Sequence, residues 1–206
     1  MVSKFEALDP EKQNRILKAA FEEFVRNGYE RASTNEIIKN ADISKGALFV
    51  YFGSKKKLFI YLFHYAVGII QQILKEMDLE ESDFFERVRQ LGLIKLRHMR
   101  QMPYAFDFLE VAIKENDADF HEEFSGIKHD VISRSFALMN QNIDYSKFRE
   151  DFELEKVLNM INWVMLGFSE QARSKLGSYE EADESHIQVF DDYIEIMKRC
   201  FYKPTE

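Results

Sequence analysis

The chain has 206 residues, 46% of them hydrophobic, so it can bury a sizeable core and is not an intrinsically disordered protein. Three prolines and eight glycines leave few helix breakers, which favours an all-α fold over a β-rich one. The single cysteine, Cys200, excludes an internal disulfide framework. The chain begins without the apolar segment of a secretory signal, and its longest apolar stretch, residues 58–70, is too short to span a membrane. We therefore expect a cytoplasmic protein.

Apolar spacing predicts nine helices in chain order. They cover residues 10–28, 33–41, 45–52, 54–77, 84–101, 104–116, 118–141, 153–176 and 184–202. Pro10 suits the first turn of a helix, and Gly28 and Gly53 suit positions after a helix end. Ser33 with Glu36 forms a capping-box signature, and Ser44 and Ser54 are further candidate N-caps. We expect two domains, residues 1–53 and residues 54–206.

The net charge of −8 is unevenly distributed between these parts. Residues 1–60 hold 11 Lys and Arg against 8 Asp and Glu, whereas the remainder holds 17 against 28. A basic N-terminal part on an acidic body favours a protein that touches a polyanion at one end only.

The second and third predicted helices are short and are joined by a tight turn at Asp42 and Ile43, as a DNA-binding helix-turn-helix requires. In such a motif the N-terminal residues of the second helix enter the major groove. Here that helix begins Ser44-Lys45-Gly46-Ala47, with small or basic side chains that let a helix approach base edges.

Three consecutive lysines, residues 55–57, follow the candidate cap Ser54. Positive charge at a helix N-terminus is disfavoured by the helix dipole. A phosphate bound there would meet both the lysines and the unpaired backbone N–H groups. The alternative is a solvated charge run that the fold tolerates.

The segments Ser44–Phe52 and Ser54–Phe59 resemble the DNA-binding signature of the TetR family of bacterial regulators. Ala19 to Tyr29 and Thr34 to Ala41 are similar to the first two helices of that family. The resemblance implies a helix-turn-helix domain on a helical ligand-binding and dimerisation domain. We expect no cofactor and no metal. It also implies DNA contacts by Thr34, Ser44, Lys45, Gly46, Ala47, Phe49, Tyr51 and Lys55. Asp42 departs from the family pattern, which has glycine at this turn.

The last two predicted helices carry more apolar residues than one buried face needs. In residues 154–168 ten of fifteen are apolar, so this helix is expected to be covered on two sides. Pairing of these two helices with their copies would give a homodimer that presents two recognition helices to a pseudo-palindromic site. One larger monomeric bundle is the alternative.

We expect the body to hold an apolar cavity for a small inducer, of hydrophobic or amphipathic character. Its candidate lining residues are Phe63, Tyr104, Phe106, Phe108, Phe136, Met139, Met160 and Trp163.

The interpretation is a homodimeric repressor that an inducer releases from DNA. An activator or DNA-bound scaffold of the same fold, without an inducer, is the alternative. An enzyme is disfavoured, because neither Glu-x-x-His nor His-Glu-x-x-His occurs and no glycine-rich phosphate loop is present. His121, Glu122, Glu123 and His129 are better explained as a solvated helix face than as a metal site.

Overall fold

The computed structural model describes residues 2–115, 118–176, 178–181 and 184–204. Within these ranges the chain is helical, and its one β-type contact is an isolated bridge between Phe148 and Tyr202. The all-α prediction is confirmed. The side chains of His121, Glu122, Glu123 and His186 lie outside the described residues.

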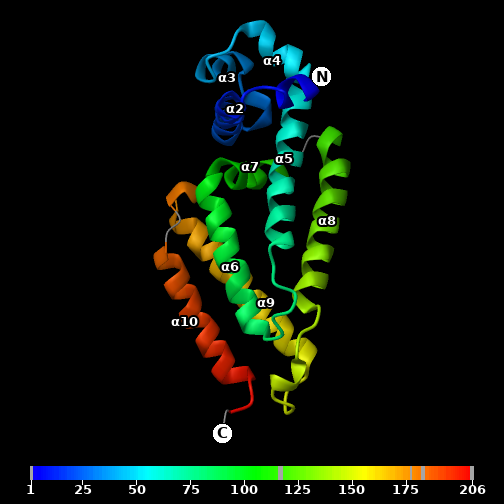
Figure 1. Ribbon diagram of the computed structural model, residues 1–206, viewed down its shortest axis with the longest axis vertical. Helices are drawn as coiled ribbons and strands as arrows, with labels where there is room; N and C mark the ends of the chain where they lie inside the picture. Colours follow the sequence, from blue (N-terminus) through cyan, green and yellow to red (C-terminus); the bar gives the residue numbers. More distant parts are fainter. Residues whose placement is uncertain (1, 116–117, 177, 182–183, 205–206) are drawn as a thin grey trace. The chain divides into compact units, whose positions relative to one another are not determined.

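The described residues form ten α-helices and two short 3₁₀ helices (Figure 1). The α-helices are α1 (Val2–Glu6), α2 (Pro10–Arg31), α3 (Thr34–Asn40), α4 (Lys45–Phe52), α5 (Lys55–Lys75), α6 (Phe84–Gln101), α7 (Pro103–Lys114), α8 (Ala118–Asn140), α9 (Leu154–Lys175) and α10 (Glu184–Phe201). The 3₁₀ helices are η1 (Tyr145–Lys147) and η2 (Tyr179–Glu181). All nine predicted helices are present, and α1 is one that the apolar spacing did not reveal.

The chain divides into two compact units. Unit 1 comprises residues 1–71 and 102–130, and unit 2 comprises residues 72–101 and 131–206. The divisions fall inside α5 and α8, and α7 belongs to unit 1, where it packs against α2. These two units differ from the predicted domains, which meet at residue 54. The predicted boundary separates the residues expected to bind DNA from the rest of the chain, and it stays a prediction.

Unit 1 is held together by an aromatic core. Phe24, Phe59 and Phe108 are almost fully buried, with ring centroids of Phe59 and Phe108 4.9 Å apart. Phe120 of α8 adds a ring 5.0 Å from Phe59. Burying an aromatic side chain contributes about 2–3 kcal/mol from the hydrophobic effect. The core therefore holds α2, α5, α7 and α8 together. These helices support α3 and α4, whose outer surface is exposed.

Unit 2 has a separate core at the N-terminal ends of α6 and α9 and the C-terminal half of α10. Its buried members are Phe84, Phe85, Val88, Phe148, Val157, Ile161, Ile194 and Met197. Because its residues in α6 and in α10 lie more than 100 positions apart in the chain, this core joins the two ends of the sequence of unit 2.

One helix, α5, is long and apolar enough to pass a test for a membrane span, with a mean hydropathy of 1.3 over its best window. Half of that window is buried inside the protein. A core helix of a globular protein has this character, so α5 is explained by packing.

Candidate functional site

The first feature of the candidate site is the turn between α3 and α4. Asp42 adopts a left-handed backbone conformation with φ of 51°, and the N–H of Ile43 donates to the carbonyl of Ile38 at 3.2 Å. Aspartate tolerates this conformation better than most residues, although less well than glycine. The turn sets two short helices against each other, as the sequence predicted for a helix-turn-helix.

The N-terminal edge of α4 is open to solvent. Ser44, Lys45 and Gly46 are exposed and Ala47 is half-buried, whereas Leu48 and Phe52 are buried. A Cβ atom added at Gly46 would meet nothing within 4 Å. We call residues Ser44–Ala47 the recognition edge. Three of its four residues are small and Lys45 is basic, and the buried side chains of Leu48 and Phe52 fix the helix behind it.

The three remaining predicted contact residues near this edge differ in exposure. Phe49 is 42% exposed, and Thr34 at the start of α3 is half-buried. Tyr51 is half-buried, with its ring 6.2 Å from that of Phe5 in an edge-on arrangement. Thr34, the recognition edge, Phe49 and Tyr51 all belong to unit 1, and their contacts with DNA stay a prediction.

Phe5 of α1 is a residue that sequence reasoning missed. It is fully buried, and its ring lies 4.9 Å from Phe52 and 5.6 Å from Tyr61. It thus braces α4 against α5 from within unit 1. Its helix has one buried residue among 5, which is too short a segment to show a helical period.

Two of the three predicted serine caps are wrong. The side chains of Ser33 and Ser44 make no capping hydrogen bond. The backbone N–H of Ser33 instead donates to Glu23 at 2.7 Å, and the carbonyl of Ser44 accepts from Ala47. Ser54 does cap α5, because its hydroxyl accepts from the N–H of Lys57 at 3.1 Å.

Lys55 is engaged inside unit 1. Its ammonium donates to the carbonyls of Glu30 and Ala32, each at 3.0 Å, and lies 4.9 Å from the centre of the Tyr29 ring. These partners lie at the C-terminal end of α2, where helix carbonyls lack internal partners and attract a cation. The lysine therefore joins α5 to α2, a role that the sequence did not reveal. Its phosphate contact stays a prediction.

Unit 2 contains an apolar cavity of about 500 Å³, within the size range of sites for small ligands. Its walls come from α6, α8, α9, α10 and η2. Apolar side chains predominate, and the described lining includes Lys95 and Arg173 but no aspartate or glutamate.

Most of the predicted lining residues lie outside this cavity, and their contact with a ligand stays a prediction. Phe136 and Met139 do line the cavity. Phe63, Tyr104, Phe106 and Phe108 belong to unit 1, where the three phenylalanines are buried in packed core. Met160 and Trp163 point to solvent from α9 and are not in the cavity wall. Aromatic spacing identifies apolar residues but does not separate core, cavity and surface.

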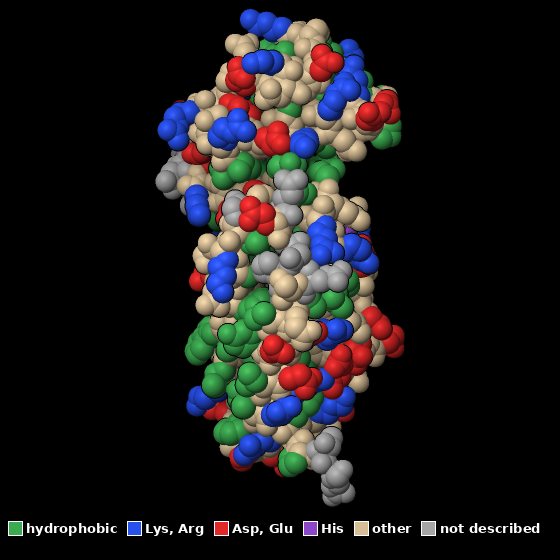
Figure 2. All heavy atoms as spheres, turned by 90° about the vertical axis from the view of Figure 1, so that its left-hand side faces the viewer, with side chains coloured by type: hydrophobic (Ala, Val, Ile, Leu, Met, Phe, Trp, Pro, Cys, Tyr) green, Lys and Arg blue, Asp and Glu red, His purple; other side chains and the backbone are tan. Residues whose placement is uncertain are grey.

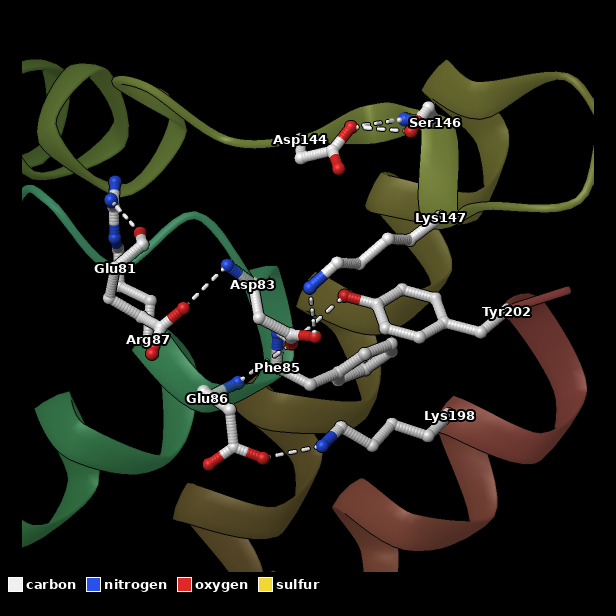
Figure 3. Close-up of polar contacts among 10 residues, drawn as sticks. All are labelled: Glu81, Asp83, Phe85, Glu86, Arg87, Asp144, Ser146, Lys147, Lys198 and Tyr202. Carbon is white, nitrogen blue, oxygen red and sulfur yellow. Dashed lines mark hydrogen bonds and ion pairs between the residues drawn. The ribbon is translucent and has the colours of Figure 1, made fainter. Parts of the chain in front are cut away.

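The N-terminal end of α6, beside the cavity, is fixed by a polar cluster around Asp83 (Figure 3). Asp83 accepts hydrogen bonds from the backbone N–H groups of Phe85 and Glu86, which caps the helix. The ammonium of Lys147 and the hydroxyl of Tyr202 also donate to this carboxylate, at 3.0 and 3.1 Å. Burial alone would raise the pKa of Asp83, but these donors together hold it below its usual value.

Arg87, one turn further along α6, is fully buried and is surrounded by carbonyl groups. It donates to Leu79 and Glu81 in the segment before α6, and to Leu138 and Gln141 at the end of α8. A buried guanidinium without these acceptors would be strongly unfavourable. Arg87 therefore ties the cavity helices α6 and α8 to one connecting segment.

The C-terminal half of α6 is tied to the end of α5 within unit 2. Glu76 accepts from Arg97 and from the ring Nε2 of His98, the latter at 2.8 Å. The hydrogen bond with His98, aided by Arg97, holds the pKa of Glu76 below its usual value. Because Lys95, Leu96 and Met99 of the same helix line the cavity, a shift of α6 would act on this contact.

An apolar surface covers the outside of α9 and α10. Its exposed members, which we call the α9/α10 face, are Met160, Trp163, Val164, Leu166, Val189, Tyr193 and Ile196. Figure 2 shows hydrophobic side chains gathered on the side of unit 2 that carries α10. Trp163 is 67% exposed, which is unusual for so large an apolar side chain. The α9 helix is thus covered by its own chain on one side and open on the other.

A model of the family described as bacterial regulatory proteins, tetR family, matches residues 16–62, which include α3, α4 and the start of α5. The chain is 38% identical over 99 residues to the transcriptional regulator QacR of Staphylococcus aureus, covering 48% of this chain and 45% of that protein. It is 25% identical to the repressor AcnR of Corynebacterium efficiens, over 76% of this chain and 79% of the relative. The fatty acid metabolism regulator protein of Bacillus subtilis is 19% identical, over 75% and 84%.

Solved structures show the same fold over nearly the whole chain. A TetR family regulator from Chloroflexus aurantiacus aligns with a TM-score of 0.63 at 18% identity, covering 98% of each chain. A tetR-family protein from Rhodococcus aligns with a TM-score of 0.65 at 16% identity, covering 96% of this chain and all of that one.

Proposed function

The chain belongs to the tetR family of bacterial regulatory proteins, which are DNA-binding regulators of transcription, and we propose that it is a homodimeric repressor released from DNA by a small ligand. The observation that carries this proposal is the recognition edge, which is exposed, small and partly basic at the N-terminus of the second helix of a helix-turn-helix. A repressor of this kind works in the cytoplasm, where bacterial DNA lies.

On this proposal α4 lies in the major groove. Ser44, Lys45, Gly46 and Ala47 then face base edges, Phe49 contacts the groove, and Tyr51 and Thr34 reach the sugar–phosphate backbone. The open space around Gly46 supports this arrangement, because a residue without a side chain lets the helix axis approach the bases. The mutual fixing of Phe5, Phe52 and Tyr61 keeps the helix rigid, so binding does not have to order it.

The dimer is proposed to form through the α9/α10 face. Two copies of such a face are self-complementary about a two-fold axis, which is the commonest symmetry of soluble oligomers. Seven large apolar side chains are exposed on these two helices, and a large exposed apolar surface is typical of a site of protein–protein interaction. A two-fold dimer also supplies two recognition helices for a pseudo-palindromic operator.

The ligand is proposed to bind in the cavity of unit 2. Its binding would shift the position of α6, whose residues form one wall of the cavity. Arg97 and His98 of α6 are hydrogen-bonded to Glu76 at the end of α5. Since α5 begins next to α4 and carries Lys55, a displacement of α5 would alter the recognition edge. The ligand must favour the DNA-free arrangement over the DNA-bound one for this to release DNA.

Two glycine variants test the DNA-binding part. Gly46 and Gly126 are both helical and exposed in unit 1, and a Cβ at either meets nothing within 4 Å. A library of random duplexes is first enriched on the wild-type protein, and affinity for the enriched duplex is then measured. We expect Gly46→Glu to bind at least about a hundredfold more weakly, because its carboxylate would face the phosphates. Gly126→Glu, the matched control, is expected to bind as the wild type does.

Equal losses in the two variants, with both folded by circular dichroism, would contradict the proposed interface. If the wild type enriched no duplex at low salt, DNA binding itself would be refuted. Enrichment of a duplex that no small molecule displaces would favour the scaffold or activator instead.

A further inference from the structure

The helix α4, which carries the recognition edge, is a short element with two buried side chains. It spans 8 residues, of which Leu48 and Phe52 are buried. A helix this short is unstable by itself, so its position is set by the elements that pack against it. Within unit 1 these elements include α3, across the turn, and α1 at the start of the described chain.

Phe5 is the residue of α1 that contacts both α4 and α5. Its side chain is fully buried, and its ring centroid lies 4.9 Å from that of Phe52 and 6.2 Å from that of Tyr51, both on α4. It also lies 5.6 Å from the ring of Tyr61 on α5. The rings of Phe52 and Tyr61 are themselves 5.3 Å apart. Three rings from three helices therefore meet, and we call Phe5, Phe52 and Tyr61 the three-ring cluster.

The helix α1 is itself fixed to the start of α2. The side-chain amide of Gln13 donates to the carbonyls of Glu6 and Leu8, at 3.0 and 2.8 Å. The backbone N–H of Leu8 donates to the carbonyl of Phe5 at 3.0 Å. These bonds restrict the short connection between the two helices, so Phe5 is held by α2 as well as by the rings that it contacts.

Reading of bases and attraction to phosphates make different demands on α4. Base readout needs hydrogen bonds of defined geometry, so the binding residues must be held within about 0.5 Å of their productive positions. Attraction of phosphates to the basic residues of a protein is independent of sequence and tolerates sliding along the duplex. Loss of the Phe5 ring would leave a space behind Tyr51 and Phe52 and loosen α4. Base readout would suffer more than phosphate attraction.

We propose that Phe5 is a positioning residue of the recognition helix, which transmits the position of α5, at Tyr61, to α4, at Phe52. This inference rests on the proposed function, because it takes α4 as the helix that reads DNA. It goes beyond that function by giving a role to α1, which precedes the matched family segment, residues 16–62. A displacement of α5 on ligand binding would then reach the recognition edge through the three-ring cluster.

Two phenylalanine variants test this role. Phe5→Leu keeps an apolar side chain but removes the ring from the cluster. Phe21→Leu is the matched control, because Phe21 is equally buried in unit 1 and its ring packs against Tyr65 of α5 and Phe108 of α7. For each protein, affinity is measured for the duplex enriched on the wild type and for a scrambled duplex of equal length and composition, at one salt concentration.

The ratio of the two affinities separates positioning from stability. We expect Phe5→Leu to lower this ratio at least about tenfold, while affinity for the scrambled duplex changes less than about twofold. Phe21→Leu should leave the ratio unchanged, although it lowers the melting temperature by a comparable amount. A merely structural role of Phe5 would lower its melting temperature and leave the ratio as it is.

A double variant tests the transmission between α5 and α4. Tyr61→Leu removes the α5 side of the cluster. If Phe5 acts by linking Tyr61 to α4, combining Phe5→Leu with Tyr61→Leu should lower the affinity ratio little more than the larger single loss. Two losses that multiply in the double variant would show that the residues act independently and would overturn the transmission.

Hydrogen exchange gives a second measurement, which needs no DNA. The backbone amides of α4 should exchange at least about tenfold faster in Phe5→Leu and less than about twofold faster in Phe21→Leu, because the first variant alone frees α4 to open locally. An unchanged affinity ratio in Phe5→Leu, or equal effects of the two variants on α4 exchange, would overturn this inference and leave the DNA-binding proposal in place. If the wild type enriched no duplex, the proposed function would fail, and the exchange rates would still decide whether Phe5 fixes α4.

Discussion

Lys45 and Lys55 occupy the first positions of neighbouring helices in unit 1, yet they are held differently. Lys45 is exposed at the recognition edge. Lys55 is half-buried and donates to the carbonyls of Glu30 and Ala32. A lysine that releases a counter-ion on binding DNA contributes about one unit to the salt dependence of affinity, whereas a lysine that joins two helices contributes to stability.

We therefore expect Lys45→Ala and Lys55→Ala to weaken DNA binding for different reasons. Lys45→Ala should lower the slope of log affinity against log salt by about one unit without changing thermal stability. Lys55→Ala should lower the free energy of unfolding by about 1–2 kcal/mol, because two helix-end carbonyls lose their donor. Salt titrations and thermal melts of both variants make the comparison. A reversed assignment, with the slope changing only in Lys55→Ala, would return the phosphate contact to Lys55.

Single residues also show where sequence reasoning about the site reaches its limit. The exposure of Ser44 and Lys45 was predictable, because serine and lysine are mostly exposed in folded proteins, and Gly46 between them and Ala47 has no side chain to bury. The position of the Lys55 ammonium was not, because its acceptors are backbone carbonyls that every residue possesses. Ser33 likewise has the cap signature, but the signature does not specify the rotamer that forms the bond.

At the scale of elements, the helices themselves were largely predictable. The prediction of 84–101 matches α6, because Asp83 caps its start and apolar residues recur at helical spacing throughout. The helix α1 was missed because its one buried residue, Phe5, gives no periodicity. How the elements pack was less predictable, as the partition of α7 into unit 1 illustrates.

The cap of α6 leads to a prediction about pH. The donors around Asp83 hold its pKa below the usual value of about 3.9, so the folded state favours the ionised carboxylate. The resulting stability is fully present above the unfolded pKa and is lost as the pH falls through the folded pKa. We expect Asp83→Asn to be less stable than wild type near neutral pH, and this gap to shrink as the pH falls below about 4.

Urea unfolding of both proteins at a series of pH values measures the gap. Asp192→Asn serves as the control, since Asp192 is an exposed carboxylate of the neighbouring α10 and should change stability little. A gap between wild type and Asp83→Asn that stays constant down to the acid limit of folding would show that the ionised cap is not the source of the difference.

For the molecule as a whole, the feature to explain is the large apolar surface that a single chain exposes to water. Val157 and Ile161 bury one side of α9, while Met160, Trp163 and Leu166 expose the other. The sequence shows that this helix has an excess of apolar residues. Which of them are buried and which are exposed depends on how unit 2 packs, and the sequence alone does not show that. Such a surface is stable in water when a second copy covers it.

A double variant tests whether a second copy of the chain covers this surface. Trp163 and Ile196 are 67% and 57% exposed, so Trp163→Asp with Ile196→Asp should leave each chain folded while placing four carboxylates in the interface of a dimer. We expect sedimentation to show a dimer for wild type and a monomer for the double variant. Ile113→Asp changes a residue of unit 1 that is 48% exposed and should remain dimeric. Because one recognition edge reads only one half-site, the monomer should also lose most of its affinity for a two-fold duplex. A double variant that stays dimeric and binds that duplex normally would locate the partner contact elsewhere.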